Sequence, residues 1–171
     1  MLTPVKKRRT VIQGRFAIVA SRYNARYVDS MLRAAKAELR RAKAEVQVVR
    51  VPGAYEIPVA AKCLARQAGA VQHGEHRIKP LGSLDAIICL GVILRGETTH
   101  AAHIGEAVSR ALMDIQLEHE VPVIHEVLLL ENEGQARKRC LDPRHNRGTE
   151  AAQTALQMAA VMRGLEDDVP F

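Results

Sequence analysis

Short apolar runs rich in β-branched residues alternate along the chain with longer stretches that have helical periodicity. The runs cover residues 16–20, 46–51, 86–93 and 123–130. Each is apolar at consecutive positions, which is typical of parallel strands that helices cover on both faces. The alternation of strand and helix predicts an α/β protein with a parallel sheet.

The stretches between the runs predict amphipathic helices. Val28, Met31, Ala35 and Leu39 recur at helical spacing, with basic residues on the opposite face. Residues 104–115 and 148–162 show the same period, residues 56–68 form a helix with Pro58 in its first turn, and residues 135–140 form a short helix. Residues 69–83 have several glycines and no period, so we expect a surface insertion there.

The length of 171 residues fits one domain. We expect residues 1–14 to form an extended arm and residues 165–171 a flexible tail. The 25 Lys and Arg against 19 Asp and Glu give a net charge of +6, so an anionic ligand fits the composition. The basic run at residues 6–9 has no interleaved aromatics and predicts a solvated arm rather than a nucleic-acid site.

Neither a membrane span nor a signal core stands out in the sequence, so we expect a cytoplasmic protein that binds neither membrane nor nucleic acid. The 3 cysteines lie far apart without CxxC spacing, which argues against a disulfide framework or a thiolate metal site. His100 and His103 have metal-ligand spacing, but no further ligands accompany them, so we expect no metal.

Unusual residues fall in the turns that follow the strands, which in a parallel sheet meet at one edge. Tyr23 and Tyr55 are rare aromatics in a chain with only 3% of them. Residues 96–98 precede a helix, where backbone N–H groups can hold a phosphate. An ordinary helix cap by Thr98 or Thr99 explains that turn equally well. His100 follows, placed to exchange protons with a bound anion.

Arginines gather near the C-terminal end of the chain, between Arg139 and Glu150. Their planar forks suit a phosphate, while a solvated basic patch is the alternative that spacing leaves open.

Several motifs occur in an order that resembles the 6,7-dimethyl-8-ribityllumazine synthase family. They are SRYN (21–24), VPGAYEIPVAAK (51–62), LGVILRGETTH (90–100), VSRALMDIQLE (108–118) and NRGTEAA (146–152). The resemblance implies a cofactor-free transferase of the penultimate step of riboflavin biosynthesis. It would condense 5-amino-6-(D-ribitylamino)uracil with 3,4-dihydroxy-2-butanone 4-phosphate to give the lumazine and release phosphate.

The resemblance also assigns roles to matching positions. For the pyrimidine and its ribityl chain it implies Tyr23 as stacking ring, Asn24, Ala54, Tyr55, Glu56, Ile93 and Leu94, with His125 where an adjoining subunit contacts the substrate. For phosphate it implies Gly96, Glu97 and Thr98, joined by Arg139 from a neighbouring subunit; His100 is the acid/base group, and Arg147 and Glu150 support the site.

Some positions depart from the family pattern. Thr99, Ala101 and Ala102 stand where the family usually has Pro, Phe and Asp, and His125 replaces an aromatic. This motivates an alternative, a lumazine- or flavin-binding shell protein with weak catalysis. A generic flavodoxin-like anion-binding or signalling module is a third hypothesis, but it leaves Tyr23 and Tyr55 unexplained.

For the fold we expect a three-layer αβα sandwich with a flavodoxin-like, four-stranded parallel sheet in the order 2-1-3-4. The resemblance further implies a homo-oligomer with active sites between subunits. It would be a pentamer or an icosahedral shell with riboflavin synthase as cargo, in which the N-terminal arm adds a strand to a neighbour's sheet.

Overall fold

The central sheet has the predicted strand order. The computed structural model describes residues 14–68, 71–73, 76–78 and 83–167; the rest of the expected N-terminal arm lies outside this range. Strands β1 (Arg15–Ser21), β2 (Glu45–Val51), β5 (Ala86–Leu94) and β6 (Val123–Leu130) pair in parallel in the order β2-β1-β5-β6. The order 2-1-3-4 expected from the sequence is confirmed.

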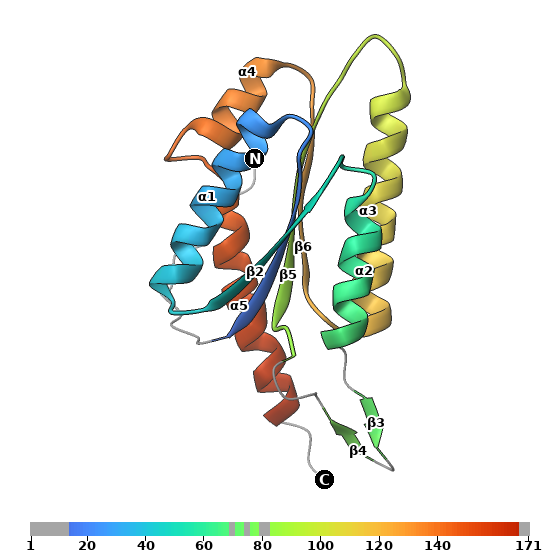
Figure 1. Cartoon of the computed structure of the whole chain (residues 1–171), viewed down its shortest axis with the longest axis vertical. Helices are drawn as coiled ribbons and strands as arrows, with labels where there is room; N and C mark the ends of the chain where they lie inside the picture. Colours follow the sequence, from blue (N-terminus) through green and yellow to red (C-terminus); the bar gives the residue numbers. More distant parts are fainter. Residues whose placement is uncertain (1–13, 69–70, 74–75, 79–82, 168–171) are drawn as a thin grey trace.

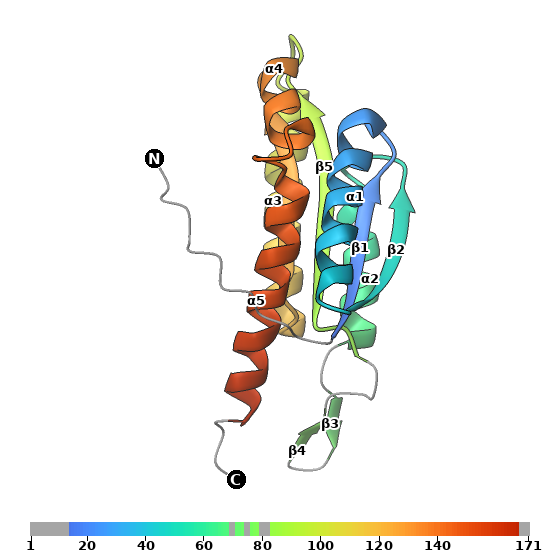
Figure 2. The ribbon, with the colours of Figure 1, turned by 90° about the vertical axis from the view of Figure 1, so that its left-hand side faces the viewer.

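Helices cover both faces of this sheet. Helices α1 (Ala25–Arg41) and α5 (Arg147–Asp167) lie side by side on one face, and α2 (Ile57–Ala68) and α3 (His100–His119) lie on the other (Figures 1 and 2). Each parallel connection therefore crosses over through a helix, as parallel strands require. The three-layer sandwich is confirmed.

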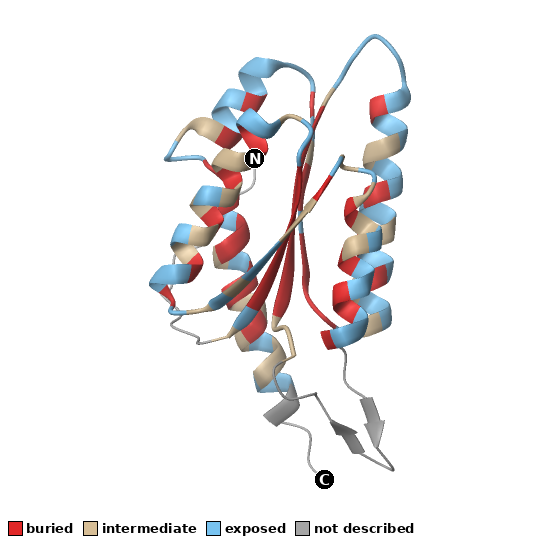
Figure 3. Ribbon diagram, in the orientation of Figure 1, coloured by how far each residue is buried: buried red, intermediate tan, exposed pale blue. Residues whose placement is uncertain are grey.

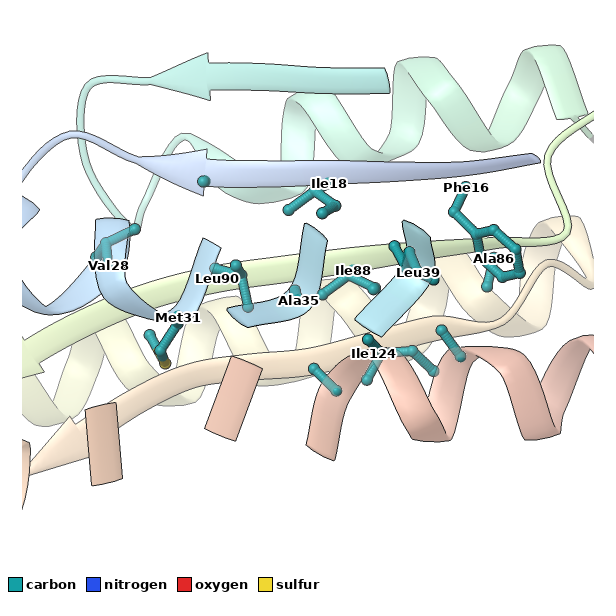
Figure 4. Close-up of a cluster of buried hydrophobic side chains, with 14 of the residues drawn as sticks. Phe16, Ile18, Val28, Met31, Ala35, Leu39, Ala86, Ile88, Leu90 and Ile124 are labelled. Carbon is teal, nitrogen blue, oxygen red and sulfur yellow. The ribbon is translucent and has the colours of Figure 1, made fainter. Parts of the chain in front are cut away.

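Successive strand residues face opposite layers and so build two separate hydrophobic cores. Figure 3 shows that the buried residues are concentrated in the central strands and on the flanking helices. Phe16, Ile18, Ile88 and Leu90 pack with α1 and α5, and Figure 4 shows this cluster with Met31 of α1 among them. The alternate strand residues pack with α2 and α3; they include Ala17, Val19, Ile87 and Cys89. The consecutive apolar runs in β1 and β5 thus serve both cores.

Strand β2 departs from the prediction that all the apolar runs are covered on both faces. Only Val51 is buried in β2, whereas Val48 is 36% exposed. β2 is an edge strand of the sheet, so among the described residues no strand lies along one side of its backbone. Hydrophobic runs alone do not distinguish a central strand from an edge strand.

The C-terminal third differs in detail from the predicted helices. The short helix expected at residues 135–140 is α4 (Glu133–Ala136) followed by a π-helical turn η1 (Arg137–Leu141). Helix α5 begins one residue earlier than predicted and continues through residues 165–167, which we expected to be a flexible tail; residues 168–171 lie outside the described range. In the expected insertion, β3 (Val71–His73) and β4 (His76–Ile78) pair antiparallel, a hairpin that the pattern did not predict.

Helix α5 begins in close contact with α1. A Cβ atom built on Gly148 would lie 2.0 Å from the backbone oxygen of Met31. Only a residue without a side chain allows this approach. The glycine of the NRGTEAA motif therefore fixes how closely α5 packs against α1.

Candidate active site

The turns that follow β1 and β2 are joined at the carboxyl edge of the sheet, the upper edge in Figure 1. The Arg22 amide donates to the Val51 carbonyl at 2.8 Å, and the Tyr23 amide donates to the Pro52 carbonyl at 3.0 Å. These bonds bring the Tyr23 turn beside the turn that carries Tyr55. Both rings are largely exposed, at 73% and 63%, which leaves their faces free to stack on a ligand.

Asn24 connects the β1 turn to β5. Its backbone is left-handed, with φ 55°, a conformation that asparagine tolerates better than most residues. Its side-chain amide donates to the Val92 carbonyl at 2.8 Å. Because that nitrogen is held by β5, Asn24 fixes the position of the neighbouring Tyr23.

Glu56 closes the turn after β2. Its Oε2 atom accepts a hydrogen bond from the Gly53 amide at 2.8 Å, just before α2 begins at Ile57. The helix therefore starts one residue later than the sequence predicted. The bond holds the carboxylate over the turn that contains Ala54 and Tyr55.

The segment from β5 to α3 is open to solvent. Ile93 is buried and Leu94 half-buried, whereas Gly96, Glu97 and Thr98 are exposed. A Cβ on Gly96 would meet no atom within 4 Å. No neighbouring atom in the described part of the chain therefore requires glycine at this position, and a ligand or a neighbouring subunit could approach its backbone.

The start of α3 is only weakly capped by its own side chains. Thr99 is the N-cap residue, as one alternative expected, but its side chain makes no cap bond. The Thr98 hydroxyl accepts from the His100 amide at 3.4 Å, a long bond. The helix start thus keeps backbone N–H groups for an outside acceptor. His100, the first residue of the helix, is exposed beside them.

An ion pair that the sequence did not suggest connects the turns after β5 and β6. The Arg95 guanidinium donates to both carboxylate oxygens of Glu131, at 3.0 and 3.2 Å. Both side chains are about half exposed, so the pair orders the edge of the site more than it stabilises the fold.

His125 lies in β6 and faces α3. Its Nε2 atom is 2.8 Å from the Ser109 hydroxyl, which donates to the Gly105 carbonyl at 2.7 Å, while its Nδ1 accepts from the Val127 amide at 3.2 Å. Because Nδ1 accepts, the proton of the neutral ring is on Nε2. Burial lowers the pKa of His125. The ring is therefore a neutral donor to Ser109.

Glu126 is a functional candidate that sequence reasoning missed. It is buried in β6, and Arg147 donates to it through two nitrogens, at 3.0 and 2.7 Å. Arg147 also pairs with Glu150. A carboxylate in an apolar strand was the clue in the sequence, since a buried charge needs a partner.

The predicted site residues therefore fall into two groups. One group lies on the turns after β1 and β2 and from the end of β5 to the start of α3; its members are Tyr23, Asn24, Ala54, Tyr55, Glu56, Ile93, Leu94, Gly96, Glu97, Thr98 and His100. Four others lie on β6, η1 and α5 instead: His125, Arg139, Arg147 and Glu150.

Within the part of the chain that the structure describes, no group of three or more His, Cys, Asp or Glu side chains could hold a metal ion. No helix in that part is long and apolar enough to cross a membrane.

The fold defines a class of protein, the flavodoxin-like α/β sandwich. Proteins of this class bind ligands at the carboxyl ends of their strands. The sequence matches the family described as 6,7-dimethyl-8-ribityllumazine synthase over residues 13–163. A 6,7-dimethyl-8-ribityllumazine synthase of Stenotrophomonas maltophilia (strain R551-3) is 38% identical over 92% of this chain and 94% of its own length. Its namesake in Xanthomonas oryzae pv. oryzae (strain PXO99A) is 40% identical over 87% of this chain and 90% of its own. The chain belongs to the 6,7-dimethyl-8-ribityllumazine synthase family.

Proposed function

We propose that this protein catalyses the condensation of 5-amino-6-(D-ribitylamino)uracil with 3,4-dihydroxy-2-butanone 4-phosphate. The products are 6,7-dimethyl-8-ribityllumazine and phosphate, the penultimate step of riboflavin biosynthesis. Family membership over residues 13–163 is the observation that carries this proposal. The cytoplasmic location expected from the sequence is part of it.

The flat pyrimidine substrate would lie on the turns that follow β1 and β2. The exposed Tyr23 ring provides a stacking surface, and the bond from Asn24 to Val92 holds that turn in place. The backbone of Ile93 and Leu94 would face the heterocycle. Ala54, Tyr55 and the Glu56 carboxylate would receive the ribityl chain, whose hydroxyls are donors for a carboxylate.

The phosphate of the second substrate would lie at the start of α3. The backbone at Gly96, Glu97 and Thr98 is exposed and uncovered, as an anion cradle must be. His100, the first residue of the same helix, would move protons during amine attack on the ketone, loss of phosphate and ring closure. Arg139 of a neighbouring subunit would complete the phosphate site.

Assembly into a homo-oligomer is part of the proposal, because Arg139 lies on the α1 and α5 side of the sheet, whereas His100 begins α3 on the opposite side. His125 lies within β6 rather than at its carboxyl end. The exposed β2 edge offers a place for the N-terminal arm of a neighbour, although those residues lie outside the described range. Met113, Leu117 and Leu129 are large apolar side chains left exposed on α3 and β6. A pentamer would cover them; a 60-subunit shell with riboflavin synthase inside is the larger form of the same assembly.

A binding protein with weak turnover is the second candidate. Ala102 is exposed at the start of α3, and its methyl group supplies no carboxylate to the proposed site. Measuring lumazine formation and pyrimidine binding on the same preparation separates the two functions. Binding without a rate above the unaided reaction would select the second.

A further inference from the structure

Glu126 is a charged residue placed in a hydrophobic core. Its side chain is 7% exposed, and it lies on the face of β6 that Ile124 and Leu130 share, toward α1 and α5. A carboxylate there is costly unless a cation holds it. The proposed reaction does not use it, so its presence calls for another explanation.

All three nitrogens of the Arg147 guanidinium donate to carboxylates. Nε and one terminal nitrogen donate to the two oxygens of Glu126, and the other terminal nitrogen donates to Glu150. This two-pronged geometry fixes the plane of the guanidinium as well as its position. Arg147 therefore braces the first turn of α5 against β6 rather than reaching for a ligand.

Asn146, the residue directly before Arg147, connects the start of α5 to η1 through hydrogen bonds. Its buried side chain donates to the Cys140 carbonyl at 2.5 Å and to the Ser30 hydroxyl at 3.3 Å, and it accepts from the Gly148 amide at 2.9 Å. Cys140 is the residue after Arg139. The η1 backbone next to Arg139 is thus hydrogen-bonded to Asn146, the neighbour of Arg147 in the chain.

The Arg139 side chain is exposed, and within the described part of the subunit this side chain makes no hydrogen bond or ion pair. Glu126 acts on this segment through space as well. Burial raises the pKa of Glu126 despite the opposing effects of Arg147 and, more weakly, of Arg139, and burial together with the nearby Glu126 carboxylate raises the pKa of the Cys140 thiol to about 11. Glu126 therefore lies near the charged and titratable side chains of η1.

We propose that Glu126 is a positioning residue that acts through Arg147 and Asn146 to set the orientation of Arg139. This inference rests on the proposed function, in which Arg139 binds the phosphate of the four-carbon substrate. Without Glu126, the Arg147 fork is held by Glu150 alone and the η1 turn loses its anchor. Arg139 would then lose more conformational freedom on binding phosphate. The affinity for the phosphate substrate would fall, while the affinity for the pyrimidine would not.

Glu126→Gln tests this with the same shape and no charge, and Glu133→Gln is the matched control, since Glu133 pairs with Arg137 on the exposed side of the same segment. We expect Glu126→Gln to raise the KM for 3,4-dihydroxy-2-butanone 4-phosphate by about three- to tenfold. The KM for the pyrimidine should stay as in the parent, and Glu133→Gln should change neither KM. Equal changes in both KM values, or none, would overturn the proposal.

A double-mutant cycle asks whether the effect passes through Arg139. In an Arg139→Ala background, Glu126→Gln should raise the KM for the phosphate substrate no further. A rise of the same size as in the parent would contradict the assigned route. If Glu126→Gln does not fold, Arg147→Lys decides: it keeps the charge but loses the fork, and should raise the same KM. An unchanged KM there would overturn the proposal.

Calorimetric titration with inorganic phosphate keeps this inference separate from the proposed function. Suppose that the protein forms no lumazine, but that Glu126→Gln weakens phosphate binding and Glu133→Gln does not. That result would contradict the proposed function and leave the positioning role of Glu126 intact. Phosphate binding equal in the parent and Glu126→Gln would contradict the positioning role whatever the turnover.

Discussion

The Asn24 side-chain amide donates to the Val92 carbonyl at 2.8 Å, which ties the left-handed turn after β1 to the end of β5. Tyr23 stands next to Asn24 and is 73% exposed. A rigid turn that presents a bare ring is suited to stacking, because little freedom is lost when a ligand binds.

Replacing Tyr23 with alanine should therefore weaken binding of the pyrimidine substrate and leave binding of the phosphate substrate unchanged. The expected rise in the KM for the pyrimidine is about tenfold, the scale of one aromatic contact. Steady-state kinetics with each substrate varied in turn measures this. Tyr27→Phe is a control, since Tyr27 is a buried residue of α1. A pyrimidine KM unchanged by Tyr23→Ala would contradict the stacking role.

Replacing His100 with alanine should lower kcat by about 10²-fold or less, at the low end of what a general acid–base group supplies. Phosphate binding should persist, because the proposed cradle is made of backbone N–H groups at the start of α3. Single-turnover rates and phosphate titration on the same variant measure both. An unchanged rate would mean that another group moves the proton.

Replacing Arg139 with alanine should raise the KM for the phosphate substrate and leave the pyrimidine KM as it is. Lys138→Ala removes a neighbouring exposed charge and serves as the control for a general electrostatic effect. Equal losses for the two substrates, or for the two variants, would contradict the assignment to phosphate.

The contact between Gly148 and Met31 predicts a large effect on stability. Gly148→Ala should lower the free energy of unfolding by about 3 kcal/mol or more, because backbone atoms cannot yield to the new methyl group. Gly164→Ala in the same helix meets no atom within 4 Å and should raise stability by about 0.5–1 kcal/mol. Urea unfolding of both variants checks this; equal effects would refute the tight packing of α5 on α1.

His125 predicts a dependence of stability on pH. Its pKa is lower in the folded protein than the usual value of about 6.5, so the unfolded chain binds the proton more tightly. Stability should therefore be highest above about pH 6.5 and fall as the pH drops through that value toward the folded pKa. Urea unfolding at pH 7.5 and 5.5 should show a smaller loss for His125→Gln; the same loss in both proteins would contradict this.

The sheet, its strand order and the edge where the turns meet could be predicted from the sequence. The strands follow from local runs of apolar residues, and the common edge follows from the parallel topology. It did not allow prediction that β2 is exposed, since Val48 looks the same whether or not a partner covers it. It also missed Glu126. The partner of that carboxylate, Arg147, lies 21 residues away along the chain, and only the packing of α5 on β6 brings the two together.

The central claim is the condensation itself, and absorbance of 6,7-dimethyl-8-ribityllumazine measures it most directly. The purified protein is mixed with the ribitylaminouracil and the butanone phosphate, beside a protein-free control because the reaction also proceeds unaided. The proposed function predicts a rate clearly above the control that falls in the His100→Ala variant. A rate equal to the control, from a protein that still binds the pyrimidine, would contradict it.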